Sequence, residues 1–173
     1  MEGNFGEILA RLRVDYPDLV FKAGRKFAFR GPKMVRIPKE LWVNTEKLLL
    51  NKEFADEHGQ KISSEQKNAG GMSKNAECRV NGEALQLLHE VGHAILRHKD
   101  FRTDVERLKM ERAAWEQARL LCERYNIYYD EDLVEEALDS YRDWLHQRSV
   151  CPECGLTRYQ GRDGVYHCPG CEV

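Results

Sequence analysis

The chain has 173 residues, enough for one domain with a small appendage, and 42% of them are hydrophobic, which suffices for an apolar core. Its 27 basic and 29 acidic residues nearly balance, so the overall charge does not point to nucleic acid or to a membrane surface. Charged residues interrupt the N-terminal apolar positions before they reach the length of a signal peptide or a membrane span. We therefore expect a cytoplasmic protein with no membrane partner.

The first half of the chain predicts one helix followed by a small sheet. Apolar residues from Phe5 to Leu12 recur at helical spacing, and Pro17 ends the pattern. Three short segments, LVFKAG, KFAFRG and KMVRIP, alternate apolar and basic residues between turn signals, which predicts an antiparallel meander. Seven basic residues and no acid lie between positions 22 and 39. Residues 51–77 are polar and rich in Gly, Ser and Asn, which predicts a long loop insertion.

The second half is helical. One apolar stripe starts near Asn81, a residue suited to capping a helix, and two further helices are expected at about 102–125 and 131–148. Together with the short strands, this pattern predicts an α+β domain over residues 1–148.

The first of these helices carries the stretch HEVGH. Residues four apart lie on one helical face, so His89 and His93 can direct imidazole nitrogens at one metal ion. Glu90 would then stand beside the ion as a general base that takes a proton from a zinc-bound water. The alternative is an ordinary amphipathic helix in which this short pattern arose by chance.

A catalytic zinc site needs a third ligand. His98 lies roughly opposite His89 on an unbroken helix, so it would reach the ion only if the helix ended first. Glu116 lies among charged residues, as on a solvated face. Glu111 instead shares its face with apolar residues, where an unpaired carboxylate is costly. The sequence thus favours Glu111 as the third zinc ligand, and the alternative is that it pairs with a buried arginine.

The stretches LLHEVGHAILRH and MERAAWEQA resemble the two motif helices of the ImmA/IrrE-type metallopeptidases, a group of small zinc gluzincins. The resemblance covers about residues 5–145 and is specific at those two helices. It implies a gluzincin-like fold with a short sheet, in which His89, His93 and Glu111 bind the catalytic zinc and Glu90 is the base. It also implies a zinc-dependent endopeptidase whose protein substrate is a regulator, such as a DNA-binding transcriptional repressor.

Three features around this site leave alternatives open. Cys78 would be an inhibitory fourth ligand or a small buried residue. An edge strand of the sheet would pair with an extended substrate, or its cations would only prevent aggregation. Amide hydrolysis also requires a hydrogen-bond donor to the oxyanion that forms when water attacks the scissile carbonyl. The sequence offers six residues for this role: Tyr125, Tyr128, Tyr129, Tyr141, His98 and His146.

Four cysteines lie near the C-terminal end of the sequence. Cys151, Cys154, Cys168 and Cys171 form two CPxC pairs separated by thirteen residues with hairpin signals between them. This spacing predicts a zinc ribbon over residues 149–173 that binds a second, structural zinc through four thiolates. A redox dithiol pair is the alternative. The few cations of this segment argue against strong phosphate affinity, so direct nucleic-acid binding is only weakly supported.

Two other functions compete with the zinc endopeptidase. The SprT-like DNA-associated proteases also combine HExxH with a C-terminal ribbon, and the basic stretch at 22–39 would suit DNA, but their third ligand is a later histidine. A non-catalytic adapter or anti-repressor would bind a protein partner and have no need of Glu90.

Overall fold

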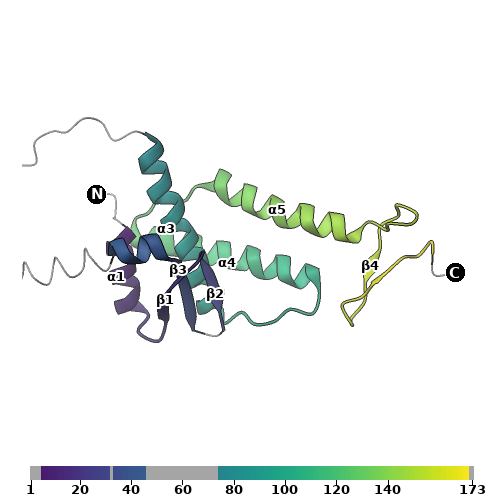
Figure 1. The fold of residues 1–173 in the computed structure, drawn as a ribbon, viewed down its shortest axis with the longest axis horizontal. Helices are drawn as coiled ribbons and strands as arrows, with labels where there is room; N and C mark the ends of the chain where they lie inside the picture. The colour runs from purple at the N-terminus through teal and green to yellow at the C-terminus, as the bar shows by residue number, and fades with distance from the viewer. Residues whose placement is uncertain (1–4, 32, 46–73, 172–173) are drawn as a thin grey trace, which may run out of the picture.

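The structure, a computed structural model, describes residues 5–31, 33–45 and 74–171 (Figure 1). Helices and short sheets are combined, so the predicted α+β class is confirmed. The predicted insertion at 51–77 lies largely outside the described residues, as does the side chain of Cys78. The helices are α1 (Phe5–Asp15), a helix at residues 39–45, α3 (Lys74–Ile95), α4 (Asp104–Tyr125) and α5 (Glu131–Ser149).

Helix α3 begins earlier than the sequence indicated. It starts at Lys74, so Asn81 lies inside the helix and the predicted cap is wrong. The stretch KNAECRV contains neither Gly nor Pro, and an internal Asn costs at most about 0.7 kcal/mol relative to Ala. That cost is too small to stop a helix whose later turns are buried.

The N-terminal sheet is not the predicted antiparallel meander. Its strands are β1 (Val20–Gly24), β2 (Ala28–Arg30) and β3 (Met34–Pro38), in the order β1-β3-β2, with β1 parallel to β3 and β2 antiparallel to β3. Packing accounts for the difference. Phe27 lies against Phe5 with their rings 6.2 Å apart, and a Cβ atom added at Gly24 would lie only 3.0 Å from Arg36 Cβ, so the absence of a side chain at Gly24 permits the close approach of β1 and β3. These contacts are made between separate segments of the chain, and the alternation of residues along a single strand does not predict them.

Helix α3 lies at the centre of the core. Its side chains at Leu85, Leu88 and Val91 are fully buried against α1, the sheet and α4. Helix α4 begins with a capping box between Thr103 and Glu106 and ends at Asn126 in the left-handed conformation. Among the described helices, none has the length and apolar character needed to cross a membrane.

The C-terminal segment, residues 149–171, packs on the ends of two helices. Its hairpin pairs β4 (Tyr159–Gln160) with β5 (Tyr166–His167), as predicted, and lies beyond α4 and α5 at the end opposite α1 (Figure 1). Asp104, the buried first residue of α4, accepts hydrogen bonds from Arg148 at 2.7 Å and Tyr166 at 2.8 Å. Burial raises the pKa of Asp104, but these hydrogen bonds outweigh it and hold the pKa below its ordinary value. An ionised carboxylate therefore joins the segment to α4 and α5.

Candidate functional site

The two HEVGH histidines and Glu111 meet in space. The Nε2 atoms of His89 and His93 lie 3.2 Å apart, and Glu111 Oε2 lies 3.2 Å from the first and 3.3 Å from the second. Both imidazoles are buried, at 4% and 8% exposure. Burial raises the pKa of Glu111, but its close contacts with the two imidazole rings outweigh it and hold the pKa well below its ordinary value. The group is thus an ionised carboxylate facing two ring nitrogens.

This spacing fits a metal ion. Ligand atoms about 2.0–2.1 Å from a tetrahedral ion lie about 3.3–3.4 Å from one another, which matches the three distances in the group. Three ligands also leave one coordination position for another molecule. Among the described residues no Lys or Arg forms an ion pair with Glu111, so the arginine alternative has no counterpart there. Glu116, in contrast, pairs with Arg119 at the surface, as its neighbours predicted.

Gly92 explains how α3 and α4 come close enough to form the group. A Cβ atom added at Gly92 would lie 2.6 Å from the backbone oxygen of Ala114, closer than real contacts allow. The missing side chain therefore lets the two helices touch next to His93 and one turn from both His89 and Glu111. This contact offsets the cost of about 1 kcal/mol that Gly brings to a helix interior.

Glu90 lies beside the metal group and contacts the sheet. Its Oε2 accepts a hydrogen bond from the backbone N–H of Phe29 on β2. Because β2 pairs only with β3 among the described strands, this N–H belongs to the free edge of the sheet. Glu90, His93 and Glu111 line one cleft of about 710 Å³ together with β2. The carboxylate expected to act as a base is therefore fixed at the wall of an accessible cavity.

His98 occupies a position that the sequence did not predict. Helix α3 ends at Ile95, Arg97 adopts a left-handed φ of 53°, and the backbone N–H of His98 donates to the carbonyl of His93 at 3.1 Å. The Nδ1 atoms of His98 and His93 then lie 2.8 Å apart. Burial lowers the pKa of His98, so the neutral ring can accept a hydrogen bond from His93 Nδ1–H, which leaves Nε2 of His93 available to a metal. A helix that ends in this way usually has Gly in the left-handed position, and such a Gly can be recognised in the sequence. Here Arg97 holds that position, so nothing in the sequence signalled the helix end.

Trp115 supports the other histidine. Its indole ring stacks on His89 with centroids 3.9 Å apart and planes at 26°. In the sequence, Trp115 is one of the apolar residues that share a helical face with Glu111. Nothing in local spacing indicates that its ring lies flat against an imidazole.

Of the six predicted oxyanion donors, Tyr141 and His98 line the cleft. Burial raises the pKa of Tyr141 to about 12, and the charge of Glu111 together with a hydrogen bond to it acts in the same direction. The Tyr141 hydroxyl is therefore protonated and lies beside the metal group. Tyr125 instead donates to Asp15 at 2.6 Å, and the ring of Tyr128 is exposed.

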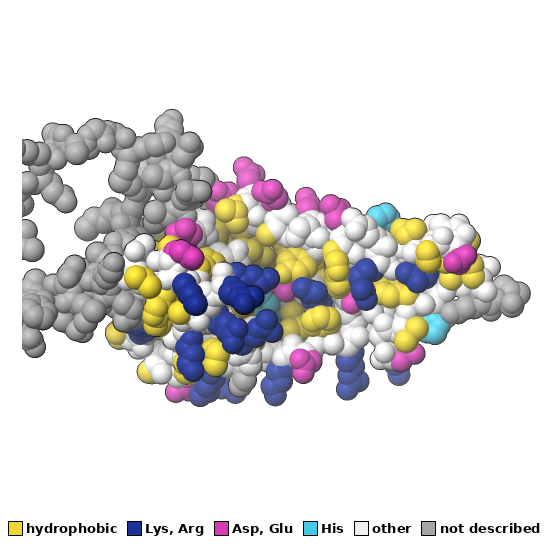
Figure 2. Space-filling view, in the orientation of Figure 1, with side chains coloured by type: hydrophobic (Ala, Val, Ile, Leu, Met, Phe, Trp, Pro, Cys, Tyr) yellow, Lys and Arg dark blue, Asp and Glu magenta, His cyan; other side chains and the backbone are white. Residues whose placement is uncertain are grey.

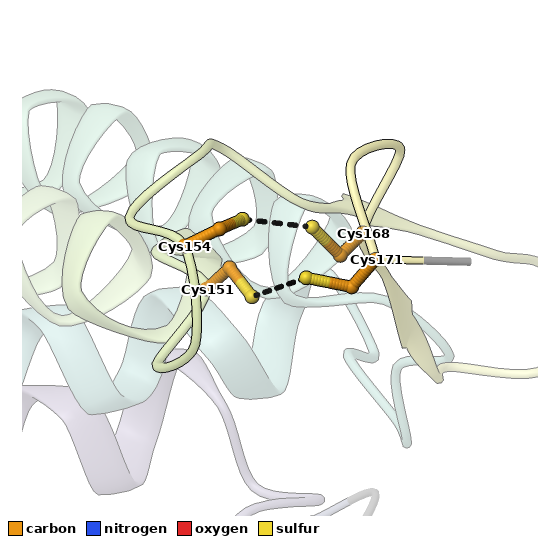
Figure 3. A group of neighbouring side chains, drawn as sticks. All are labelled: Cys151, Cys154, Cys168 and Cys171. Carbon is orange, nitrogen blue, oxygen red and sulfur yellow. Dashed lines mark hydrogen bonds between the residues drawn. The ribbon is translucent and has the colours of Figure 1, made fainter. Parts of the chain in front are cut away.

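The four C-terminal cysteines form a second group of possible ligands (Figure 3). The Sγ atoms of Cys151 and Cys171 lie 3.9 Å apart, and those of Cys154 and Cys168 lie 3.4 Å apart. These distances exceed a disulfide bond of about 2.05 Å and bracket the roughly 3.8 Å separation of sulfurs bound tetrahedrally at about 2.3 Å. Backbone N–H groups of Cys154 and Glu153 lower the pKa of Cys151 to about 7, which favours the thiolate. The chemistry and spacing suit a metal ion with no open position.

No protein-family model matches the chain, no curated protein is significantly similar to it, and no solved structure matches it.

Proposed function

We propose that this protein is a zinc-dependent endopeptidase of the ImmA/IrrE gluzincin type that cleaves a regulatory protein, such as a DNA-binding repressor, in the cytoplasm. One observation carries the proposal: two members of a His₂Glu ligand group, His93 and Glu111, line the same cleft as a separate carboxylate, Glu90. Two imidazoles and a carboxylate are a ligand set that catalytic zinc uses in hydrolases. A binding module would have no use for the carboxylate base.

The residues of the chain divide the work of amide hydrolysis. When bound by His89, His93 and Glu111, zinc polarises the scissile carbonyl and lowers the pKa of water. Glu90 removes the proton from the attacking water and delivers it to the leaving amine. The Phe29 N–H keeps the Glu90 carboxylate at the cleft wall. The hydroxyl of Tyr141 donates a hydrogen bond to the oxyanion that forms as water attacks the scissile carbonyl.

The sheet edge supplies the substrate track. An extended peptide adds along the β2 edge as a further strand and makes its backbone hydrogen bonds to edge groups other than the Phe29 N–H, which holds Glu90. The scissile bond then lies between this edge and the metal group. The C-terminal segment acts as a zinc ribbon in which a structural zinc stabilises residues that have little apolar core.

The rival DNA-associated protease would take its third ligand from a histidine. Among the described residues the third member of the group is Glu111, and the later His98 contacts His93 through Nδ1 instead. This favours the gluzincin type.

Zinc content and cleavage together test the proposal. Elemental analysis should find about two zinc ions per chain in the wild type and about one in Glu111→Ala. Glu116→Gln is the matched control, since it removes a surface carboxylate from the same helix and should keep both ions. A peptide mixture derived from a bacterial proteome should be cleaved by the wild type. Glu90→Gln should retain both ions and lose cleavage. One zinc ion in wild type and Glu111→Ala alike, with zinc in excess, would refute the catalytic site.

A further inference from the structure

The cleft is lined by more positive charge than its own carboxylates balance. Lys26 and Arg30 lie on the β2 side, and Lys99 and Arg107 lie on the other side. Two of the three carboxylates that line the cleft are already engaged, Glu90 by the Phe29 N–H and Glu111 by the histidines, which leaves Asp100. Within the described part of the chain, none of the four cations forms an ion pair with a carboxylate.

Arg107 is the most firmly positioned of these cations. Its guanidinium lies over three rings, 4.8 Å from the centroid of Trp144, 5.3 Å from Tyr141 and 5.4 Å from Phe101. It lies one turn before Glu111 on α4, so both side chains point from the same helical face. Aromatic rings occupy the flat faces of a guanidinium but leave N–H groups at its edge available to a carboxylate. Arg107 is thus a preorganised cation beside the metal group.

The positive surface continues from the cleft over the outer face of the sheet. Exposed Lys22 and Arg36 lie directly opposite each other on β1 and β3. Like charges at paired positions destabilise a sheet, and no acid occurs between residues 19 and 39 to neutralise them. Figure 2 shows Lys and Arg side chains gathered over this region. The arrangement costs stability in isolation, and a negative partner would recover that cost.

We propose, on the basis of the peptidase function proposed above, that the substrate segment bound in this cleft is acidic. Arg107 binds a carboxylate side chain next to the scissile bond, and Lys26 and Arg30 bind carboxylates of the same segment from the β2 side. In an extended peptide, alternate side chains point to opposite sides, so acids on both faces of the strand meet cations. A peptide is favoured over a nucleic acid because the cations of the cleft flank a strand edge and the residues proposed for amide hydrolysis.

Binding of simple probes tests the inference. The zinc-loaded Glu90→Gln protein is titrated against a fluorescein-labelled peptide of alternating Glu and Ala, and against the matched Gln and Ala peptide, with anisotropy as the readout. The Glu peptide should bind at least ~10-fold more tightly than the Gln peptide, because charge-assisted hydrogen bonds are the stronger kind. Added salt should weaken the binding of the Glu peptide and leave the Gln peptide unaffected.

Three variants locate the binding to the cleft. Arg107→Gln should weaken binding of the Glu peptide about 10-fold. Arg112→Gln removes the same charge from an exposed position of the same helix, outside the cleft, and should change nothing. Arg107 also contacts Tyr141, so its replacement can act indirectly. The double variant Lys26→Gln/Arg30→Gln changes only exposed residues and should likewise weaken binding of the Glu peptide.

The outcomes are distinguishable. Equal affinity for the two peptides, or equal effects of Arg107→Gln and Arg112→Gln, would overturn the inference. A labelled DNA duplex that displaces the peptide and depends on Arg107 would overturn it in favour of nucleic acid. Wild-type protein that cleaves proteome-derived peptides without preference for acids near the scissile bond would refute the acidic substrate but not the peptidase. Arg107-dependent binding without any cleavage would support the acidic ligand and refute the peptidase.

Discussion

Replacing Gly92 by Ala tests whether the close approach of α3 and α4 forms the metal centre. The new Cβ would lie 2.6 Å from the carbonyl oxygen of Ala114, against 3.4 Å or more for ordinary contacts, so the helices must separate by about 0.4–0.8 Å. Metal ligands tolerate displacements of about 0.2 Å. The separation moves Glu111 away from the histidines by more than this tolerance, so we expect zinc to be lost from this site and retained by the cysteines.

The effect on stability has two opposing parts. Alanine improves helix propensity by about 1 kcal/mol, while overpacking against a rigid backbone costs about 1–3 kcal/mol. The net change should be a loss of up to about 2 kcal/mol in the free energy of unfolding, measured by urea denaturation of the zinc-free protein.

Gly82→Ala is the matched control on the same helix. Its added Cβ would lie 3.5 Å from a Leu133 methyl group, an ordinary contact, so it should raise stability by about 0.5–1 kcal/mol without changing zinc content. If Gly92→Ala behaved like Gly82→Ala in both stability and zinc content, the helix contact would not be what positions Glu111.

Three further substitutions address other contacts. His98→Ala removes the hydrogen-bond partner of His93 and should weaken zinc binding at the His₂Glu site about 10- to 100-fold, as measured by competition with a chelator, whereas unchanged affinity would assign His98 no role there. Tyr141→Phe should lower turnover roughly 100- to 1,000-fold with zinc content unchanged; steady-state kinetics with equal turnover would remove Tyr141 as the oxyanion donor. Asp104→Asn should destabilise the fold near neutral pH, because Arg148 and Tyr166 lose an ionised acceptor. Since the folded pKa of Asp104 is lowered, its contribution is complete above the ordinary value of 3.8 and is lost as pH falls through the folded pKa. Urea denaturation should therefore show the wild type and Asp104→Asn converging in acid, and a constant difference would contradict the argument.

Local spacing was sufficient for several parts of the site. The distance of four residues between His89 and His93 places both on one helical face whatever the helix packs against. The spacing of the cysteine pairs likewise predicted a group of four neighbouring sulfurs, because each pair lies within one tight turn. Glu111 was found through its unfavourable position on an apolar stripe. In each case the information lies within a few residues of the chain.

Other parts depend on contacts between distant residues. Local alternation does not determine which strands pair, and the parallel β1–β3 pairing is accompanied by contacts between separate segments, namely the packing of Phe27 on Phe5 and the close approach of Gly24 and Arg36. His98 faces His93 only because Arg97 turns the chain back after α3, a conformation that carries no local sequence signal. The sequence alone determined which side chains are able to bind metal and move protons, since that depends on residue type and helical period. Tertiary structure decided which of them share one cleft and which side chains hold them there, because those relations arise from packing between segments far apart in the chain.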